Sequence, residues 1–329
     1  MSVAETLPPP LAEAARRAGE LECVRCELCG ADDTRLLFHA RDTLLGRAER
    51  YPVVQCRRCG LAYLNPRPSR AAMAQHYPAD YFNDLGGGGA SHTGARRTLK
   101  SVLYRLTGGI ARKIESLPPG RVLDVGCGDG RYLAFFRDLG WETCGTDPSA
   151  VAIARTRARG LNVAPPGELA EARYPDRTFD LAILRYTIEN MHHPLATLRE
   201  VRRVLKDDGV VFVSAPSITS PVARLFRHYC AYVEAPRHLY FFSPETLPAL
   251  LTRAGFRVVE LARVAWPSLA RDVANRLSGG RYRRFFARRW VSRAVWLAGV
   301  PPSLLLAYLG FNRGNLEVIA EKNLSERAD

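Results

Sequence analysis

The sequence is poor in acidic residues and lacks the marks of a secreted chain. Its 329 residues include 33 Asp and Glu against 47 Lys and Arg, a formal net charge of +14. An excess of that size favours anionic partners such as nucleic acid, phosphorylated metabolites or an acidic membrane surface, and a solvated Arg-rich surface explains it equally well. No signal peptide opens the chain, and the eight cysteines are not spaced like a disulfide framework. We therefore expect a reducing cytoplasm.

Four of the cysteines stand in two C-x-x-C pairs. Cys26 and Cys29 belong to CELCG, and Cys56 and Cys59 belong to CRRCGL. Zinc takes four tetrahedral donors, and two such knuckles bring four thiolates to one point. Short apolar runs between the pairs predict a hairpin. The pattern indicates a structural zinc ion in a small ribbon, with reduced thiols without metal as the alternative and Cys23 as a competing ligand.

A second motif is VLDVGCGDG, from Val122 to Gly130. An apolar run enters a glycine turn, and RYLAFFRDLG follows with apolar residues at helical spacing, which predicts strand, turn and helix. Glycine lets a ligand lie against bare backbone, and the helix start offers unpaired N–H groups. The spacing is G-x-G-x-G, whereas a dinucleotide fingerprint is G-x-G-x-x-G. A second strand ends in Asp147, where an acid typically accepts the hydroxyls of a ribose.

Together these residues resemble the class I S-adenosylmethionine-dependent methyltransferases. The resemblance implies an α/β fold, with a Rossmann-like seven-stranded sheet and helices on both faces, and S-adenosylmethionine as cofactor. It implies that Asp124, Gly126 and Gly128 hold the amino-acid end of the cofactor and that Asp147 binds its ribose. Glu168 is a candidate for contact with the adenine, with a plain surface position as the alternative.

The resemblance extends on both sides of this motif. N-P-R-P after the second cysteine pair, then Tyr-Pro and Tyr-Phe, looks like the start of a zinc-carrying methyltransferase subgroup. Some members of that subgroup methylate nucleotide-linked sugars. FDLAIL matches the family's fourth strand, and NLEVIAEK is expected as its antiparallel seventh strand. We therefore expect methylation of a hydroxyl or carbon on a sugar-like or other small polar metabolite, free, nucleotide-linked or lipid-linked.

Methyl transfer also needs a group that removes a proton from the acceptor. The subgroup has a His before an aromatic-Phe-Ser run, and His238 occupies that position. An imidazole titrates near neutral pH, so it can take this proton; the alternative is a His satisfied by core hydrogen bonds. The family usually shows Glu-His in the loop after the fourth strand, where this chain has Glu189-Asn190, which weakens the loop as a source of the base. Glu189 remains a candidate there, and His193, with His192, is a substitute for the missing His.

A basic and apolar insert precedes the last strand. Arginines and aromatic residues alternate over 281–293, and residues 294–311 carry no charge. Eighteen residues only just reach the length of a membrane span, and Pro301-Pro302 would interrupt that helix. We expect two short helices that pack on the domain or lie on an anionic membrane surface, with a true span least favoured. The protein would then be cytoplasmic, with peripheral contact at the inner membrane face.

Two other functions stay open. Charge and zinc knuckles suit an RNA methyltransferase, but an Asn-Pro-Pro-Tyr-like tetrad is missing and nucleic acid is the less favoured partner. A non-catalytic cofactor-binding scaffold is disfavoured by the intact glycine turn and Asp147. The expected organisation is a mobile N-terminus at 1–22, a zinc ribbon at 23–66, a helical linker or lid at 67–119, a methyltransferase core at 120–264, the insert at 265–313, and a last strand with tail at 314–329.

Overall fold

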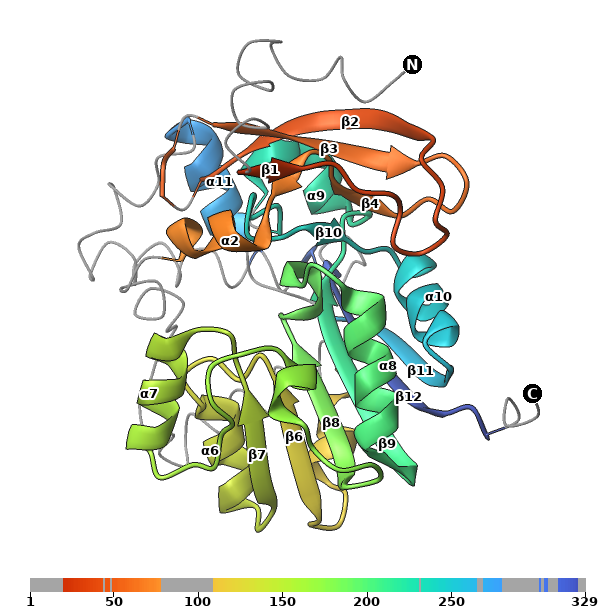
Figure 1. The fold of residues 1–329 in the computed structure, drawn as a ribbon. Coiled ribbons are helices and arrows are strands. Elements are labelled where there is room, and N and C mark those ends of the chain that lie inside the picture. Colours follow the sequence, from red (N-terminus) through yellow and green to blue (C-terminus); the bar gives the residue numbers. More distant parts are fainter. Residues whose placement is uncertain are drawn as a thin grey trace.

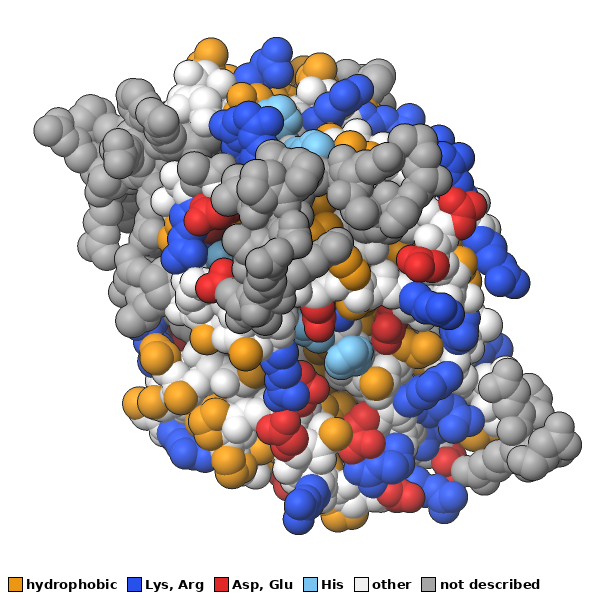
Figure 2. All heavy atoms as spheres, turned by 45° about the horizontal axis from the view of Figure 1, so that its top comes forward, with side chains coloured by type: hydrophobic (Ala, Val, Ile, Leu, Met, Phe, Trp, Pro, Cys, Tyr) orange, Lys and Arg blue, Asp and Glu red, His pale blue; other side chains and the backbone are white. Residues whose placement is uncertain are grey.

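The computed structural model describes residues 20–43, 45–47, 49–77, 109–230, 232–264, 269–279 and 313–324, with positions 302, 305 and 306. Almost all of the expected N-terminal segment and of the 281–311 insert lies outside these residues. The described residues form a small ribbon stacked on a larger α/β unit (Figure 1). Lys and Arg side chains are spread widely over the face seen in Figure 2, as the net charge requires.

The larger unit is built on a mixed six-stranded sheet in the order β11-β12-β9-β8-β6-β7. The first four strands in sequence are parallel to one another, and β12 runs antiparallel to both β9 and β11. The bounds are β6 Arg121–Val125, β7 Glu142–Thr146, β8 Phe179–Arg185, β9 Leu205–Pro216, β11 Phe256–Val264 and β12 Asn315–Lys322.

One of the seven expected strands, the third in sequence, is reduced within the described residues to one bridge. Val163 pairs with Gly145 beside β7, in parallel, and no ladder continues from it. The Ala164 N–H donates to the Gly145 carbonyl oxygen at 3.0 Å, but Pro165 and Pro166 come next, and proline has no N–H to donate to a ladder. The sequence therefore supplies only one pairing where the family pattern implies a strand.

Successive side chains along the strands point to opposite faces of the sheet and contribute to two hydrophobic clusters, one on each face. Leu123 and Leu184 join a cluster with residues of α8 and α10, while Val122 and Ile183 join one with residues of α5 and α6. Helices therefore cover both faces, as the sequence predicts (Figure 1). The bounds are α5 Ala111–Glu115, α6 Arg131–Asp138, α7 Ala150–Ala158, α8 Pro194–Val204 and α10 Thr246–Arg253, with short 3₁₀ turns η3 Leu169–Ala172 and η4 Ile188–Asn190.

The ribbon contains the hairpin expected between the two cysteine pairs, and it borrows one strand from the larger unit. Its antiparallel sheet has the order β10-β4-β3-β2, and β10 is Tyr240–Phe241. Residues far beyond the second cysteine pair thus complete the sheet. The other bounds are β2 Thr34–Arg41, β3 Arg50–Cys56 and β4 Ala62–Leu64, with a separate pair of β1 Leu21–Glu22 and β5 Arg67–Pro68.

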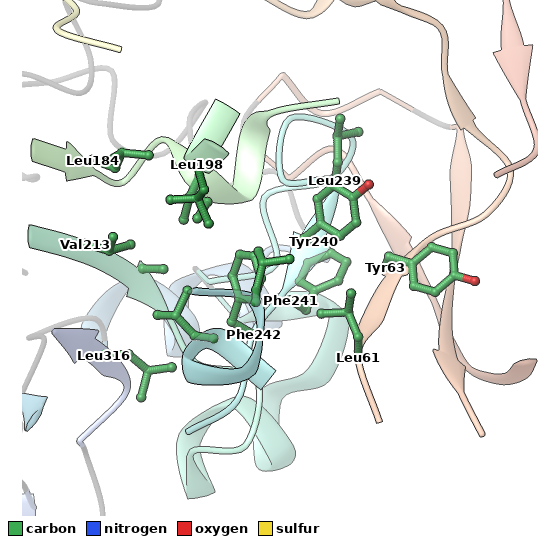
Figure 3. Packing of buried hydrophobic residues seen from close by; sticks show 14 of the residues in the cluster. Leu61, Tyr63, Leu184, Leu198, Val213, Leu239, Tyr240, Phe241, Phe242 and Leu316 are labelled. Atoms are coloured by element: carbon green, nitrogen blue, oxygen red, sulfur yellow. The ribbon is translucent and has the colours of Figure 1, made fainter. Parts of the chain in front are cut away.

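The borrowed strand makes the two parts share one hydrophobic core. Tyr240 pairs with Tyr63, their ring centroids 6.3 Å apart, and both are buried. Figure 3 shows this row continuing through Phe242 towards Leu184 and Leu316 of the large sheet. The ribbon is therefore packed on the α/β unit as part of its core.

Shorter elements surround this seam. The stretch 67–119, expected to be helical, begins instead with the strand β5 and becomes helical only afterwards. None of the helices in the described ranges combines the length and apolar character needed to cross a bilayer. The remaining bounds are α2 Arg70–Met73, η2 Ala74–His76, α9 Pro221–Phe226, η5 Arg227–Tyr229 and α11 Leu269–Leu277.

Candidate active site

The sheet topology brings the sequence motifs to one edge. β6, β7 and β8 are parallel neighbours, so their carboxyl ends lie side by side. Gly126 follows β6, Asp147 follows β7, and Tyr186 follows β8. In open α/β sheets, ligands bind outside this edge.

The glycine turn adopts a conformation that other residues rarely take. Gly126, Gly128 and Gly130 have φ values of 78°, 56° and 75°. A Cβ on Gly126 would stand 2.0 Å from Oγ1 of Thr187. The backbone N–H groups of Gly126 and Cys127 donate to the Thr146 carbonyl oxygen at 2.8 and 3.0 Å, which ties the turn to β7. The turn is thus a bare-backbone cradle that a side chain would fill.

Both predicted acids lie at this turn and are buried. Asp147 Oδ2 accepts from the Gly128 N–H at 2.9 Å, and Oδ1 accepts from the Ser149 N–H at 2.8 Å. Burial raises the pKa of Asp147, and these two N–H groups oppose the rise. Burial raises the pKa of Asp124 to about 7, with Arg185 opposing the rise and Asp147 adding to it. The structure therefore brings together Asp124, Asp147 and the glycines, as predicted.

Arg185 is a cationic neighbour that the sequence analysis missed. It ends β8, and its guanidinium lies 4.7 Å from the ring centroid of Tyr132 on α6 and 5.4 Å from that of Tyr186. A cation closing the apolar run FDLAIL at a ligand-binding edge was the available signal. The aromatic faces hold the positive charge where it acts on Asp124.

Glu168 lies close to this edge of the sheet, and its side chain forms an ion pair with Arg70. The Gly167 N–H donates to the Asp147 carbonyl oxygen at 3.1 Å, which places the segment beside β7. The Glu168 carboxylate lies 3.3 Å from Nε of Arg70, and both side chains are more than a third exposed. Glu168 thus stays a candidate for contact with the adenine, and its carboxylate has a surface partner in Arg70.

Two of the predicted proton acceptors meet beyond the end of β8. Glu189 lies in η4 with a side chain that is 1% exposed, and His238 Nε2 lies 4.0 Å from its Oε1. Within the described residues, neither Glu189 carboxylate oxygen has a hydrogen-bond partner. Burial raises the pKa of Glu189 to about 8, and Glu234 adds to the rise. A buried carboxyl without partners is costly, which is typical of a site that receives a ligand.

The hydrogen bond on the other side of His238 fixes its tautomer. Nδ1 lies 2.9 Å from the carbonyl oxygen of Tyr232, which can only accept, so Nδ1 carries the proton. In the neutral imidazole, Nε2 is then the unprotonated nitrogen, and it lies 4.0 Å from Oε1 of Glu189. The Leu239 N–H donates to the Glu189 carbonyl oxygen at 2.7 Å and holds the two segments together.

A fully buried arginine anchors this pair to the ribbon. Arg237 donates to both carboxylate oxygens of Asp42 at 2.9 and 3.0 Å and, through Nε, to Glu234 at 2.8 Å. The His238 N–H donates to the Glu234 carbonyl oxygen at 3.0 Å. Sequence reasoning missed this network, because Asp42 is nearly 200 positions away and has no motif of its own.

Tyr77 is a tyrosine whose pKa is affected by acids of both sets. It belongs to the Tyr-Pro pair after N-P-R-P, and burial raises its pKa, with Glu234, Asp147 and Glu189 adding to the rise. Charges near the cofactor edge and the charge of the predicted base thus both act on the Tyr77 phenol.

The structure does not bring His193 to this pair. His193 is exposed, precedes α8 and lines an open hollow beside Cys26 on the ribbon side. His192 is buried, with Nε2 3.1 Å from the Pro68 carbonyl oxygen, and its own carbonyl oxygen accepts from Arg67 at 3.1 Å. Both histidines therefore lie at the seam between β5 and α8.

The four cysteines of the two pairs meet as predicted. Their sulfur atoms all lie within 4.8 Å of one another, with Cys26 to Cys59 at 3.4 Å and Cys29 to Cys56 at 3.5 Å. The knuckles repeat each other, because the glycine after each pair donates to the carbonyl oxygen of the first cysteine and has positive φ. Cys23 is exposed and does not belong to the cluster.

Comparisons with known proteins agree with this geometry. A probable S-adenosylmethionine-dependent methyltransferase of Mycobacterium tuberculosis is 27% identical over 201 residues, covering 60% of this chain and 69% of that protein. The ubiquinone biosynthesis O-methyltransferase of Azorhizobium caulinodans is 28% identical over 185 residues, covering 52% of this chain and 72% of that protein.

Solved structures give fold likenesses only. The [4+2]-cyclase SpnF has a TM-score of 0.48 at 23% identity, covering 78% of this chain and 98% of its own. A SAM-dependent methyltransferase from Archaeoglobus fulgidus has a TM-score of 0.47 at 20% identity, covering 74% and 99%. No conclusion rests on these two scores.

The family profile described as a methyltransferase domain matches residues 97–261, half of the chain. That range contains the glycine turn, both predicted acids and the loop of Glu189. With the bare-backbone turn and the two acids at the carboxyl edge of the sheet, this match identifies the cofactor as S-adenosylmethionine. The chain belongs to this methyltransferase-domain family and is a class I S-adenosylmethionine-dependent methyltransferase.

Proposed function

We propose that this enzyme methylates a hydroxyl or carbon of a sugar-like or other small polar acceptor, using Glu189 and His238 to remove the acceptor's proton. The observation that carries the proposal is the buried Glu189 carboxyl, which has no hydrogen-bond partner within the described residues and lies 4.0 Å from Nε2 of His238. Such a pair can bind an acceptor hydroxyl through one member and pass its proton to the other.

The cofactor end of the site is made for a zwitterionic nucleoside. S-adenosylmethionine, when bound, supplies an electrophilic methyl group and a good leaving group. The glycine turn offers backbone where a Cβ on Gly126 would collide with Thr187, and Asp147 is buried and held by two N–H groups. We assign the turn and Asp124 to the amino-acid end of the cofactor and Asp147 to its ribose. What remains for the protein is to align the acceptor and hold its proton.

A hollow at the other end of the same edge suits an anionic part of the acceptor. It lies where β9 and β11 end and β12 begins, and its volume is about 200 Å³. Arg263 and Arg313 line it, and both are exposed. The other lining residues are Ser217, Thr219, Ser220 and Pro221. Guanidinium and hydroxyl groups together favour a phosphate, so we propose a nucleotide-linked or otherwise phosphorylated acceptor.

A transfer assay tests this proposal. The full-length protein is incubated with S-adenosylmethionine labelled in its methyl group and with free sugars, sugar nucleotides, quinols or RNA in separate reactions. We expect label on a sugar nucleotide, a rate reduced about 100-fold in Glu189→Gln, and unchanged affinity for S-adenosylhomocysteine. Label on RNA or a quinol would replace the proposed acceptor. An unchanged rate in Glu189→Gln would remove Glu189 from the chemistry.

We also propose that the cysteine cluster holds a structural zinc ion. A tetrahedral site with zinc–sulfur bonds of about 2.3 Å has sulfur–sulfur edges of about 3.8 Å, within the spread of this cluster. We expect one zinc per chain, lost in Cys56→Ser and retained in Cys23→Ser, together with a lower melting temperature after chelation. Metal analysis that finds full-length, folded protein with four free thiols and no zinc would contradict this.

A further inference from the structure

The helix α11 has the reverse of the usual amphipathic pattern. Asp272 and Asn275 are buried, at 0% and 1% exposure, whereas Val273 and Leu277 are 40% and 84% exposed. Arg276 is exposed on the same side, because residues three and four apart share a face. A surface helix of a globular protein normally buries its aliphatic residues and exposes its polar ones. Leu269, at the start of α11, packs on the hydrophobic core, but Val273 and Leu277 leave the rest of the aliphatic face exposed.

The neighbouring helix extends this aliphatic face. α9 packs against α11, and the Asn275 side-chain amide donates to the carbonyl oxygen of Tyr229 just after α9 at 3.0 Å. α9 buries Val222 and Phe226, yet Leu225 is 71% exposed, next to the exposed Arg224. Both helices lie beside the ribbon (Figure 1). Large exposed aliphatic residues on adjacent helices mark an interaction surface.

Arginines act on His228 in η5, the turn that contacts both α9 and α11. Burial lowers the pKa of His228 in η5, and the four charges that act on it most, Arg41, Arg50, Arg276 and Arg227, all lower it further. They come from β2, β3, α11 and η5, which are the elements in contact here. We call the exposed Leu225, Val273 and Leu277 with these four arginines the α9–α11 surface.

Charge and hydrophobicity together specify the partner. Exposed aliphatic side chains on two helices, with arginines on the same and neighbouring elements, match a lipid bilayer with anionic headgroups, where the aliphatic side chains enter the acyl boundary and the arginines contact phosphates. A nucleic acid would use the arginines but leave the leucines in water. The chain also continues from α11 into the Arg-rich and apolar residues 281–311, so the composition of the surface is continuous with that of the sequence that follows.

We propose that the α9–α11 surface docks the enzyme on an anionic membrane. The docking does not depend on the acceptor proposed above, and it places the methyltransferase at the bilayer without a membrane-spanning segment in the described ranges. It predicts binding that needs both the aliphatic and the basic residues, and that weakens with salt because headgroup attraction is screened.

Sedimentation of the full-length protein with vesicles tests the proposal. The vesicles contain phosphatidylglycerol and phosphatidylcholine, or phosphatidylcholine alone. We expect binding only to the vesicles that contain phosphatidylglycerol. The double variant Leu225→Asp, Leu277→Asp should bind about tenfold or more weakly. Arg227→Gln and Arg276→Gln should each bind about fivefold more weakly. Val259→Asp, at an exposed aliphatic residue of β11, is the matched control and should bind like the wild type.

Binding of S-adenosylhomocysteine shows that each variant is folded and separates this test from that of the acceptor. Wild-type binding to both kinds of vesicle alike, or equal binding of the wild type and the aspartate variants, would overturn the proposal. The second result would assign any membrane contact to residues outside the α9–α11 surface. Tight, salt-sensitive binding of RNA without vesicle binding would assign the surface to nucleic acid instead.

Discussion

The two halves of the proposed active site are built in different ways. The cofactor half, from Asp124 to Asp147, is one strand–turn–helix–strand unit whose contacts are local backbone hydrogen bonds. The acceptor half gathers Glu189, His238 and the ribbon residue Asp42 through side chains and a borrowed strand. A short sequence motif can specify a local unit. A site assembled from distant segments depends on every one of those segments keeping its position.

The sharpest test of this difference is Arg237→Met. The substitution leaves Asp42 and Glu234 buried without their cation, which is expected to cost about 3–5 kcal/mol of unfolding free energy. It should also release the segment that carries His238, so methyl transfer should fall with stability. Urea unfolding followed by circular dichroism measures the first effect and a transfer assay the second.

Arg257→Met is the matched control for Arg237→Met. Arg257 pairs with Glu321 at 2.6 Å on the surface, with side chains 64% and 41% exposed. Exposed pairs contribute about 0–1 kcal/mol, so this variant should unfold almost like the wild type. Equal destabilisation by the two substitutions would mean that the buried network does not hold the acceptor half.

The cofactor half should respond to one side chain without losing its fold. Asp147→Ala should weaken binding of S-adenosylhomocysteine about 100-fold, because a buried carboxylate oriented by two N–H groups makes strong hydrogen bonds to hydroxyls. Glu168→Ala should weaken it less than about threefold, since its partly exposed carboxylate already pairs with Arg70. Titration calorimetry measures the affinity of each variant for S-adenosylhomocysteine. A similar loss of affinity in both variants would mean that Glu168 contributes as much to binding as Asp147.

The same contrast explains what could be predicted from the sequence. The glycine turn, Asp147 and the two cysteine pairs are local patterns in which spacing alone fixes geometry, and the structure brings each set together. The antiparallel last strand of the large sheet followed from the family resemblance. The expected third strand did not form beyond one bridge at Val163, because two prolines follow it and cannot donate to a ladder.

The acceptor half could be predicted only in part. His238 was a candidate because of its place before an aromatic run, but nothing local indicated that Glu189 would be buried beside it. The roles of β10 and Arg237 depend on pairings between residues more than 150 positions apart. Such pairings leave no periodic trace in one sequence, so the shared core of ribbon and sheet emerged only from the structure.

Glu189 gives the acceptor half a pH dependence. Its pKa is about 8 in the folded protein, above the unfolded value of about 4.3, so the folded state binds this proton more tightly. The stabilising contribution of the protonated form is full below the unfolded pKa and is lost as pH rises through 8. The melting temperature should therefore fall between pH 5 and pH 9 in the wild type, and this fall should be smaller by about 3 °C or more in Glu189→Gln, which has no carboxyl to ionise.

Thermal unfolding of the cofactor-free protein across this pH range measures the difference. Glu142→Gln is the control, since Glu142 pairs with Arg121 in solvent and its side chain is 59% exposed. The control should follow the wild-type curve. A Glu189→Gln curve parallel to the wild type would mean that the carboxyl of Glu189 is ionised in the folded protein and is stabilised by a partner of opposite charge.

The smallest expected effect concerns the hollow at the ends of β9 and β11. Arg263→Gln and Arg313→Gln should each raise the KM for a phosphorylated acceptor about tenfold, with kcat and the KM for S-adenosylmethionine nearly unchanged. A remote anionic group contributes the same binding energy before and during methyl transfer, so its loss appears in KM alone. Arg257→Gln, near the other end of β11, is the control. A fall in kcat would instead place these arginines among the groups that align the reacting atoms, and the acceptor half would then be as tightly organised as the cofactor half.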